Sequence, residues 1–171
     1  MTFTPRTWSV GEVVSAAQLN TEIRNQFNSI ITAWTAYTPT WTAVTTNPVL
    51  GNGSLVGQHM KIGRTCHVTF NLTMGSTTTY GSGFWRISLP FTAATVASGS
   101  PGVLNYTYSR SANPNFTLGA GPIGSGASNT DNIWLPSLTD MGDYNVITGS
   151  SPWVPAAGEV LRGYGTYQTA A

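Results

Sequence analysis

The sequence predicts a mainly β protein, in which an N-terminal extended arm and one α-helix precede a jelly-roll-like antiparallel β-sandwich. Only residues 15–34 carry apolar side chains at helical spacing. After them, short apolar and β-branched runs alternate with turn-forming Gly, Pro, Asn and Ser. Residues 37–171 have room for about eight to ten such strands, and short strands at regular spacing are typical of a sandwich or jelly roll.

Composition limits the possible functions. The chain of 171 residues is long enough for one domain and a short appendage, which we place at residues 37–171 and 1–36. Only 8% of the residues are charged, against about 25% in an average protein. A surface so poor in charge is common where many subunits pack together. The net charge of +1 gives no reason to expect nucleic acid or a membrane as partner, and one cysteine excludes an internal disulfide.

The predicted helix has a well-defined start. Ser15 is a good N-cap, and Gln18 is placed to complete a capping box with it. Val14 and Leu19 have the spacing of a hydrophobic staple. The apolar stripe then continues at spacings of four, three and four residues through Ile23, Phe27, Ile30 and Trp34.

This stripe has to be buried, and the chain offers no second helix. It docks on its own β-domain, on copies of itself or on a larger partner. In heptad notation Asn20, Phe27 and Trp34 fall at a positions, where Asn20 could set the register of a symmetric bundle. Trp8, in the arm, either packs back on the helix or contacts a neighbouring protein. The residues expected at an oligomer or anchor interface are Trp8, Val14, Leu19, Asn20, Ile23, Phe27, Ile30 and Trp34.

The clearest strand signal is residues 65–74, where Cys66, Val68, Phe70, Leu72 and Met74 alternate with polar residues. We interpret residues 119–124, which superficially match GxGxxG, as a loop because proline is present and no helix follows. The predicted strands are 37–45, 55–62, 65–74, 84–89, 102–110, 115–118, 132–138, 144–148 and 159–169.

Residues with catalytic or metal-binding chemistry are few. A two-residue turn at Gly63-Arg64 would place Met60 opposite His67 and His59 opposite Val68, so the two histidines would point to opposite faces of the sheet. That arrangement disfavours a shared metal site, and we expect no metal or other cofactor. Asp140 and Asp143 have the types needed for calcium binding or glycoside hydrolysis, but a polar turn around Gly142 is the favoured interpretation.

No Ser–His–acid motif is present, so we expect a protein that is not an enzyme. Among the aromatic residues, Tyr80 in a polar loop and Trp153 near two prolines are those expected to be exposed. Either could stack on a sugar, which makes them candidate glycan contacts.

The start of the chain, TWSVGEVVSAAQLNTEIRNQFN, resembles the recurrent N-terminal segment of virion proteins of tailed bacteriophages. The matching positions are Trp8, Gly11, Glu12, Ala16, Ala17, Gln18, Leu19, Asn20 and Arg24. Residues 36–90 and the ending WVPAAGEVLRGYGTYQ resemble β-domains in structural proteins of phages and prophages of actinobacteria. The similarity covers most of the chain and is weakest from 100 to 145.

The resemblance implies a virion protein assembled in the host cytoplasm, with a compact, trimeric jelly-roll head and other virion proteins as partners. A receptor-binding fibre has a long repetitive shaft, whereas this chain has one helix and one head. We therefore expect a surface protein that decorates the capsid, of decoration or head-fibre type. The alternatives are a minor tail or tail-fibre protein and a host-adhesion head that binds cell-surface glycan.

Overall fold

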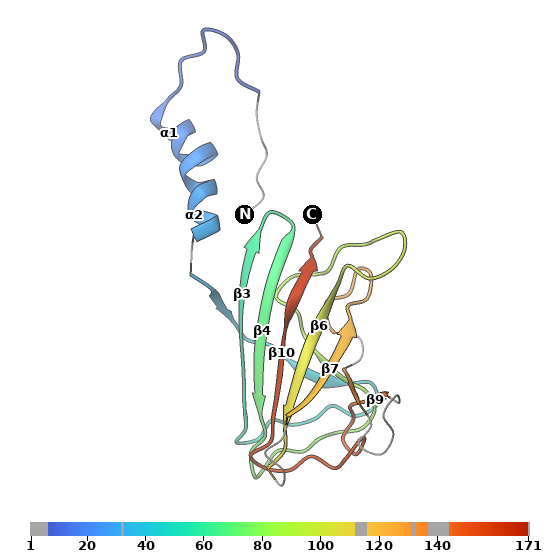
Figure 1. Ribbon diagram of the computed structural model, residues 1–171. Helices are drawn as coiled ribbons and strands as arrows, with labels where there is room; N and C mark the ends of the chain where they lie inside the picture. The colour runs from blue at the N-terminus through green and yellow to red at the C-terminus, as the bar shows by residue number, and fades with distance from the viewer. Residues whose placement is uncertain (1–6, 32, 112–115, 131–132, 137–143, 171) are drawn as a thin grey trace.

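The computed structural model describes residues 7–31, 33–111, 116–130, 133–136 and 144–170. The protein is mainly β, with 42% strand and 10% helix, and every strand pair is antiparallel, which confirms the predicted class. Jelly-roll connectivity and the trimer stay predictions. Figure 1 shows the helix standing beyond the end of a long sheet, joined to it by a short connection.

The ten described strands form two sheets. In chain order they are β1 (Thr35–Tyr37), β2 (Trp41–Ala43), β3 (Ser54–Ile62), β4 (Thr65–Thr73), β5 (Trp85–Ile87), β6 (Gly102–Ser109), β7 (Phe116–Pro122), β8 (Trp134–Pro136), β9 (Tyr144–Val146) and β10 (Val160–Gln168). The larger sheet has the order β1-β3-β4-β10-β6-β7-β8-β9, and β2 pairs with β5 in the smaller one. The last strand, β10, therefore lies in the middle of the larger sheet.

The helical stretch differs from the prediction in two respects. It consists of α1 (Ala16–Leu19), a π-helical segment η1 (Asn20–Arg24) and α2 (Asn25–Ile31), so it is not one regular α-helix. It also ends earlier than expected. Trp34, predicted as the last residue of the helical stripe, lies in the connection just before β1.

The first predicted strand, residues 37–45, is wrong as a single element. Pro39 has no N–H to give to a sheet ladder, so the chain leaves β1 there and restarts as β2 in the other sheet. The predicted loop at 119–124 is also wrong, because Gly119 to Pro122 belong to β7. Gly119 pairs with Tyr106 of β6 in the register of the larger sheet.

The core lies between the smaller sheet and one face of the larger sheet, which we call the inner face. The predicted alternation of β4 is confirmed, since Cys66, Val68, Phe70, Leu72 and Met74 are all buried. Across the strands a row of paired residues alternates between aromatic rings and glycine: Tyr37, Gly57, Phe70, Gly163, Tyr106 and Gly119. Each ring has room because the neighbouring residues in the row have no side chain.

The opposite face of the larger sheet, which we call the outer face, carries no second layer of described residues. On β4 and β10 its side chains include Thr69, Asn71, Tyr164 and Thr166, all exposed or half-buried. An antiparallel sheet commonly leaves one face to solvent. The outer face is therefore a broad surface available for contact with another molecule.

Candidate assembly interface

The helix begins as the sequence predicts. The backbone N–H of Ser15 donates to Oε1 of Gln18 at 2.7 Å, and the N–H of Gln18 donates to the Ser15 hydroxyl at 3.3 Å. This reciprocal pair is the predicted capping box. The cap satisfies backbone donors that the first turn would otherwise leave open, which fixes where the helix starts.

The described part of the arm contains a turn just before the helix. The N–H of Glu12 donates to the carbonyl of Ser9 at 3.1 Å, and the Ser9 N–H donates to Oε2 of Glu12 at 3.2 Å. Gly11 has a φ of +83°, which the third position of a type II turn requires. The turn leaves Val10 and Val13 exposed.

The arm and the helix expose many large apolar side chains. Of the nineteen large hydrophobic side chains exposed in the described residues, ten lie between Trp8 and Trp34. Phe27, in the middle of the helix, is 65% exposed. We call this surface the helix stripe; its residues are Leu19, Ile23, Phe27, Ile30 and Ile31. So much exposed apolar area on one short segment is typical of a binding surface.

The π-helical segment changes the composition of the stripe. A π turn takes one more residue than an α turn, so residues after Arg24 are set back by about one position. Ile31 then takes the place that Ile30 would have in a regular helix, and it is largely exposed. The heptad assignment of Asn20, Phe27 and Trp34 therefore does not hold, because η1 interrupts the repeat and Trp34 follows the helix.

The stripe does not dock on the protein's own β-domain, here meaning β1 to β10. Every residue of the helix stripe is more than two-fifths exposed. The contact between the helix and the strands is small and joins α2 to β3. Figure 1 shows the helix clear of both faces of the larger sheet. Of the three alternatives for burying the stripe, two remain, namely copies of this chain and a larger partner.

The predicted exposure of Trp153 is wrong. It is 9% exposed, its ring meets Tyr108 edge-on at 4.9 Å between centroids, and the Arg110 guanidinium lies 4.9 Å from the ring centroid. Tyr80 is half-buried and packs against Trp85, with 6.5 Å between ring centroids. Among the β-domain side chains whose burial the structure describes, the exposed aromatic ones are instead Phe84, Phe116 and Tyr164.

The two histidines lie on opposite faces, as predicted from the Gly63-Arg64 turn, since Met60 pairs with His67 and His59 with Val68. His59 faces inward between Tyr37 and Phe91, with ring centroids 5.9 and 5.0 Å away. Burial lowers the pKa of His59. His67, on the outer face, has Nδ1 2.9 Å from the Thr166 hydroxyl.

Cys66 is buried, and burial raises the pKa of its thiol, as expected for a packing residue that is not a nucleophile. Three or more His, Cys, Asp or Glu side chains in a metal-binding arrangement do not occur in the part of the chain that the structure describes. Asp131, Asp140 and Asp143 lie outside the described residues.

One acidic residue has a role that the sequence did not reveal. Glu159 is 2% exposed; it accepts a hydrogen bond of 2.7 Å from the Tyr108 hydroxyl and lies 3.9 Å from Nε of Arg110. Buried charges need such partners to be tolerated. Tyr108 and Arg110 lie at the end of β6 and just after it, and Glu159 directly precedes β10, so this cluster connects the ends of two central strands.

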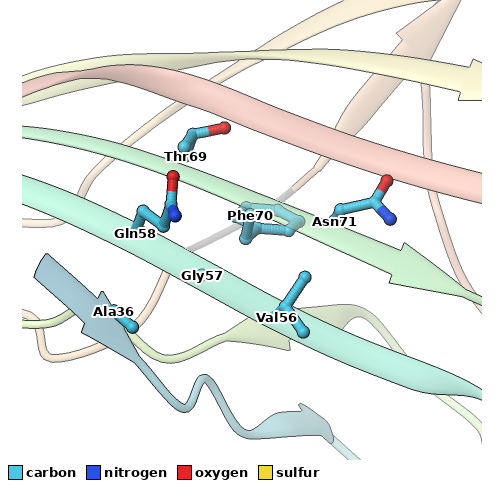
Figure 2. A pocket seen from close by; sticks show the side chains of 7 residues that line it. All are labelled: Ala36, Val56, Gly57, Gln58, Thr69, Phe70 and Asn71. Atoms are coloured by element: carbon cyan, nitrogen blue, oxygen red, sulfur yellow. The ribbon is translucent and has the colours of Figure 1, made fainter. Parts of the chain in front are cut away.

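Two shallow hollows mark the outer face. Figure 2 shows the first, of about 390 Å³, where Val56, Gln58, Thr69 and Asn71 stand around the backbone of β3 and β4. The second, of about 510 Å³, is lined by Thr107, Phe116, Leu118 and Arg162. We call the second one the β7 groove. The sequence does not predict it, because Arg162 on β10 lies far along the chain from the residues of β6 and β7.

Comparison with protein-family models, with curated proteins and with solved structures found no match. Within the described residues, no helix has the length and apolar character needed to span a membrane. The candidate site therefore rests on the geometry of the helix stripe and the outer face.

Proposed function

We propose that this protein is a non-enzymatic structural subunit of a tailed-bacteriophage virion, a trimeric surface protein that decorates the capsid. The arm and helix attach it to the particle and to its own copies, and the β-domain faces outward. The observation that carries the proposal is the helix stripe, which is apolar and not covered by the β-domain, on a helix whose start is fixed by a capping box.

An assembly role accounts for why the chain keeps such a surface. A helix of this length is marginal in water, and its stability comes chiefly from burying an amphipathic face. Exposed hydrophobic patches in a free protein also promote aggregation. A subunit whose helix becomes buried on joining a particle avoids both costs.

The low charge of the whole chain supports the same role. Subunit contacts favour uncharged side chains at the centre of the interface. The helix stripe consists of aliphatic and aromatic residues, and the outer face of the five long strands carries a single charged residue, as expected for a protein covered by neighbours over much of its surface.

The sequence similarity to N-terminal segments of virion proteins includes the first residues of the helix. Of the matching positions, Gln18 completes the capping box and Leu19 opens the helix stripe. A minor tail protein would use the same segment in the same way. The copy number per particle separates the two locations, because hundreds of copies indicate the capsid and a handful indicate the tail.

The test replaces one stripe residue by a charge. Phe27→Glu places a carboxylate in the centre of the stripe, and we expect it to reduce the protein's copy number in purified particles by about tenfold or more. The copy number is measured by mass spectrometry of particles from cells that supply only the variant.

The matched control is Thr21→Glu, which adds the same charge at an exposed polar position of the helix. It should leave incorporation close to the wild-type level. Normal incorporation of Phe27→Glu, with a wild-type circular dichroism spectrum, would contradict attachment through the helix. Complete absence of the wild-type protein from particles would contradict the virion role itself.

A further inference from the structure

The outer face of the larger sheet is unusually poor in charge. Its residues on the five long strands, β3, β4, β10, β6 and β7, follow from the register, because paired residues share a face. Among them Arg162 is the only Lys, Arg, Asp or Glu. A solvated sheet face normally carries several charges, which also prevent unwanted association.

Apolar side chains gather at one side of this face. Phe116 and Leu118 on β7 are each 64% exposed. Leu118 on β7 pairs with Thr107 on β6, which in turn pairs with Arg162 on β10. Leu118, Thr107 and Arg162 therefore form one row over three strands. The β7 groove lies over this row, between Arg162 and the two β7 side chains.

We propose that the β7 groove receives the helix stripe of a second copy of this chain. The proposal rests on the proposed function and specifies how copies meet within the assembly. The chain contains two apolar surfaces that the monomer leaves uncovered, one on a helix and one on a sheet. Packing a helix on a sheet face is one of the few stable ways to cover both.

The helix of the same chain is poorly placed to fill the groove. It connects directly to β1, at one edge of the larger sheet, whereas β7 lies five strands away. Five inter-strand spacings amount to about 24 Å. The four steps from Ile31 to Thr35 span at most about 14 Å. A helix aligned with the strands at that distance would lie near β1 and β3, so the groove is left for a neighbouring copy.

Length and charge also fit. The helical stretch from Ala16 to Ile31 is about 24 Å long, and β6, from Gly102 to Ser109, spans about 26 Å. Arg162 is the only charged residue among the outer-face positions of the five long strands, and the residues of the helix stripe are all uncharged, so burying the stripe beside Arg162 brings no like charges together.

The contact joins two different surfaces, so each copy offers its helix to one neighbour and its groove to another. Such a heterologous contact closes into a ring when the rotation permits. A closed ring of three, with every helix on the next copy's groove, would be the trimer expected for this protein.

Disulfide trapping tests the contact in the full chain. The double variant Phe27→Cys/Leu118→Cys should form covalent dimers and trimers under mild oxidation, seen on a non-reducing gel. The native Cys66 is fully buried and does not interfere. The matched control is Phe27→Cys/Val44→Cys, because Val44 is exposed beside the smaller sheet, away from the groove. The control should give no trimer.

A second measurement avoids dependence on the cysteines. Leu118→Glu should raise the dissociation constant between copies by about tenfold or more, measured by light scattering over a concentration series. Circular dichroism verifies that the variant is folded. Loss of the oligomer in both Leu118→Glu and Phe27→Glu supports the proposal.

Three results would overturn it. The first is a wild-type monomer at all concentrations. The second is a disulfide within one chain, seen as a fast-migrating monomer, which means that the groove is filled by the chain's own helix. The third is an unchanged oligomeric mass in Leu118→Glu while Phe27→Glu still fails to enter particles. In that case the helix binds another virion protein, and the proposed function stands without this contact.

Discussion

Tyr37 lies directly over Gly57, its partner across β1 and β3, and the tyrosine ring fills the space that a side chain at Gly57 would need. Ring and glycine together hold the short edge strand β1 against the long strand β3. The hydroxyl of Tyr37 also lies 3.4 Å from the carbonyl of Ser88, to which it donates. This contact fixes the point where the helix joins the β-domain.

Gly57→Ala should therefore destabilise the protein although alanine is the better strand residue. The new methyl group would collide with the Tyr37 ring and with Pro39, and overpacking of this kind costs about 1–3 kcal/mol. Urea denaturation measures the loss. In a Tyr37→Ala background the same substitution should cost less, because the ring is gone. Equal costs in the two backgrounds would contradict the contact.

Tyr108→Phe should lower the free energy of unfolding by about 2 kcal/mol, because it leaves the buried Glu159 carboxylate without its 2.7 Å hydrogen bond. The matched control is Tyr164→Phe, which removes an exposed hydroxyl from β10 and should change stability by less than about 0.5 kcal/mol. Similar stability of the two variants would show that the Tyr108–Glu159 pair contributes little.

Stability should fall as the pH drops below about 6.5, the ordinary pKa of histidine. Burial between aromatic rings lowers the pKa of His59 in the folded protein, and Lys61 follows on the same face of β3. The unfolded chain then binds the proton more tightly than the folded one, so acid favours unfolding. The stability that depends on neutral His59 is fully present above about pH 6.5. It is lost as the pH falls through the pKa that His59 has in the folded protein.

His59→Phe removes this titration and keeps a ring between Tyr37 and Phe91. Its unfolding free energy should change less than that of the wild type between about pH 7.5 and about pH 5, a window above most carboxyl pKa values. The comparison uses thermal or urea unfolding at each pH. Parallel profiles for the two proteins would contradict the role of His59.

The Cys66 thiol should react with a thiol reagent such as dithionitrobenzoate only after unfolding. It is fully buried, and burial raises its pKa, so the reactive thiolate is neither accessible nor populated at neutral pH. The reaction is followed by absorbance in buffer and in denaturant. Rapid reaction of the folded protein would contradict the packing around β4.

Much of the fold can be predicted from local patterns in the sequence. The alternation in β4, the Gly63-Arg64 turn and the Ser15–Gln18 capping box all depend on residues close together in the chain, and the structure has each of them. The strand register around the turn follows from the turn length, so it was predictable as well. These features need no knowledge of the rest of the molecule.

Features that depend on distant residues were not predictable. The second half of β7, from Gly119 to Pro122, is rich in glycine and is predicted as a loop, because its pairing with β6 depends on residues outside the local pattern. Trp153 is predicted to be exposed between two prolines, yet it is covered by Tyr108 on β6 and by Arg110, which follows that strand. The π-helical segment leaves no recognisable mark on the sequence.

The candidate interface was predicted in part for the same reason. The helix stripe is a local pattern, and Leu19, Ile23, Phe27 and Ile30 are exposed on the helix. The groove on the outer face is assembled from β10, β6 and β7, and its members are separated by up to about fifty residues in the chain. Only the sheet order brings them together.

The central position of β10 has a consequence for synthesis of the protein. Its residues Val160 to Gln168 pair with β4 on one side and with β6 on the other, so without them the larger sheet falls into two separate pieces. The inner face of β4 and β6 stays incompletely covered until this last strand has left the ribosome. The larger sheet therefore cannot be completed before Val160 to Gln168 have been synthesised, and a chain released before Val160 should be a substrate for chaperones and proteases.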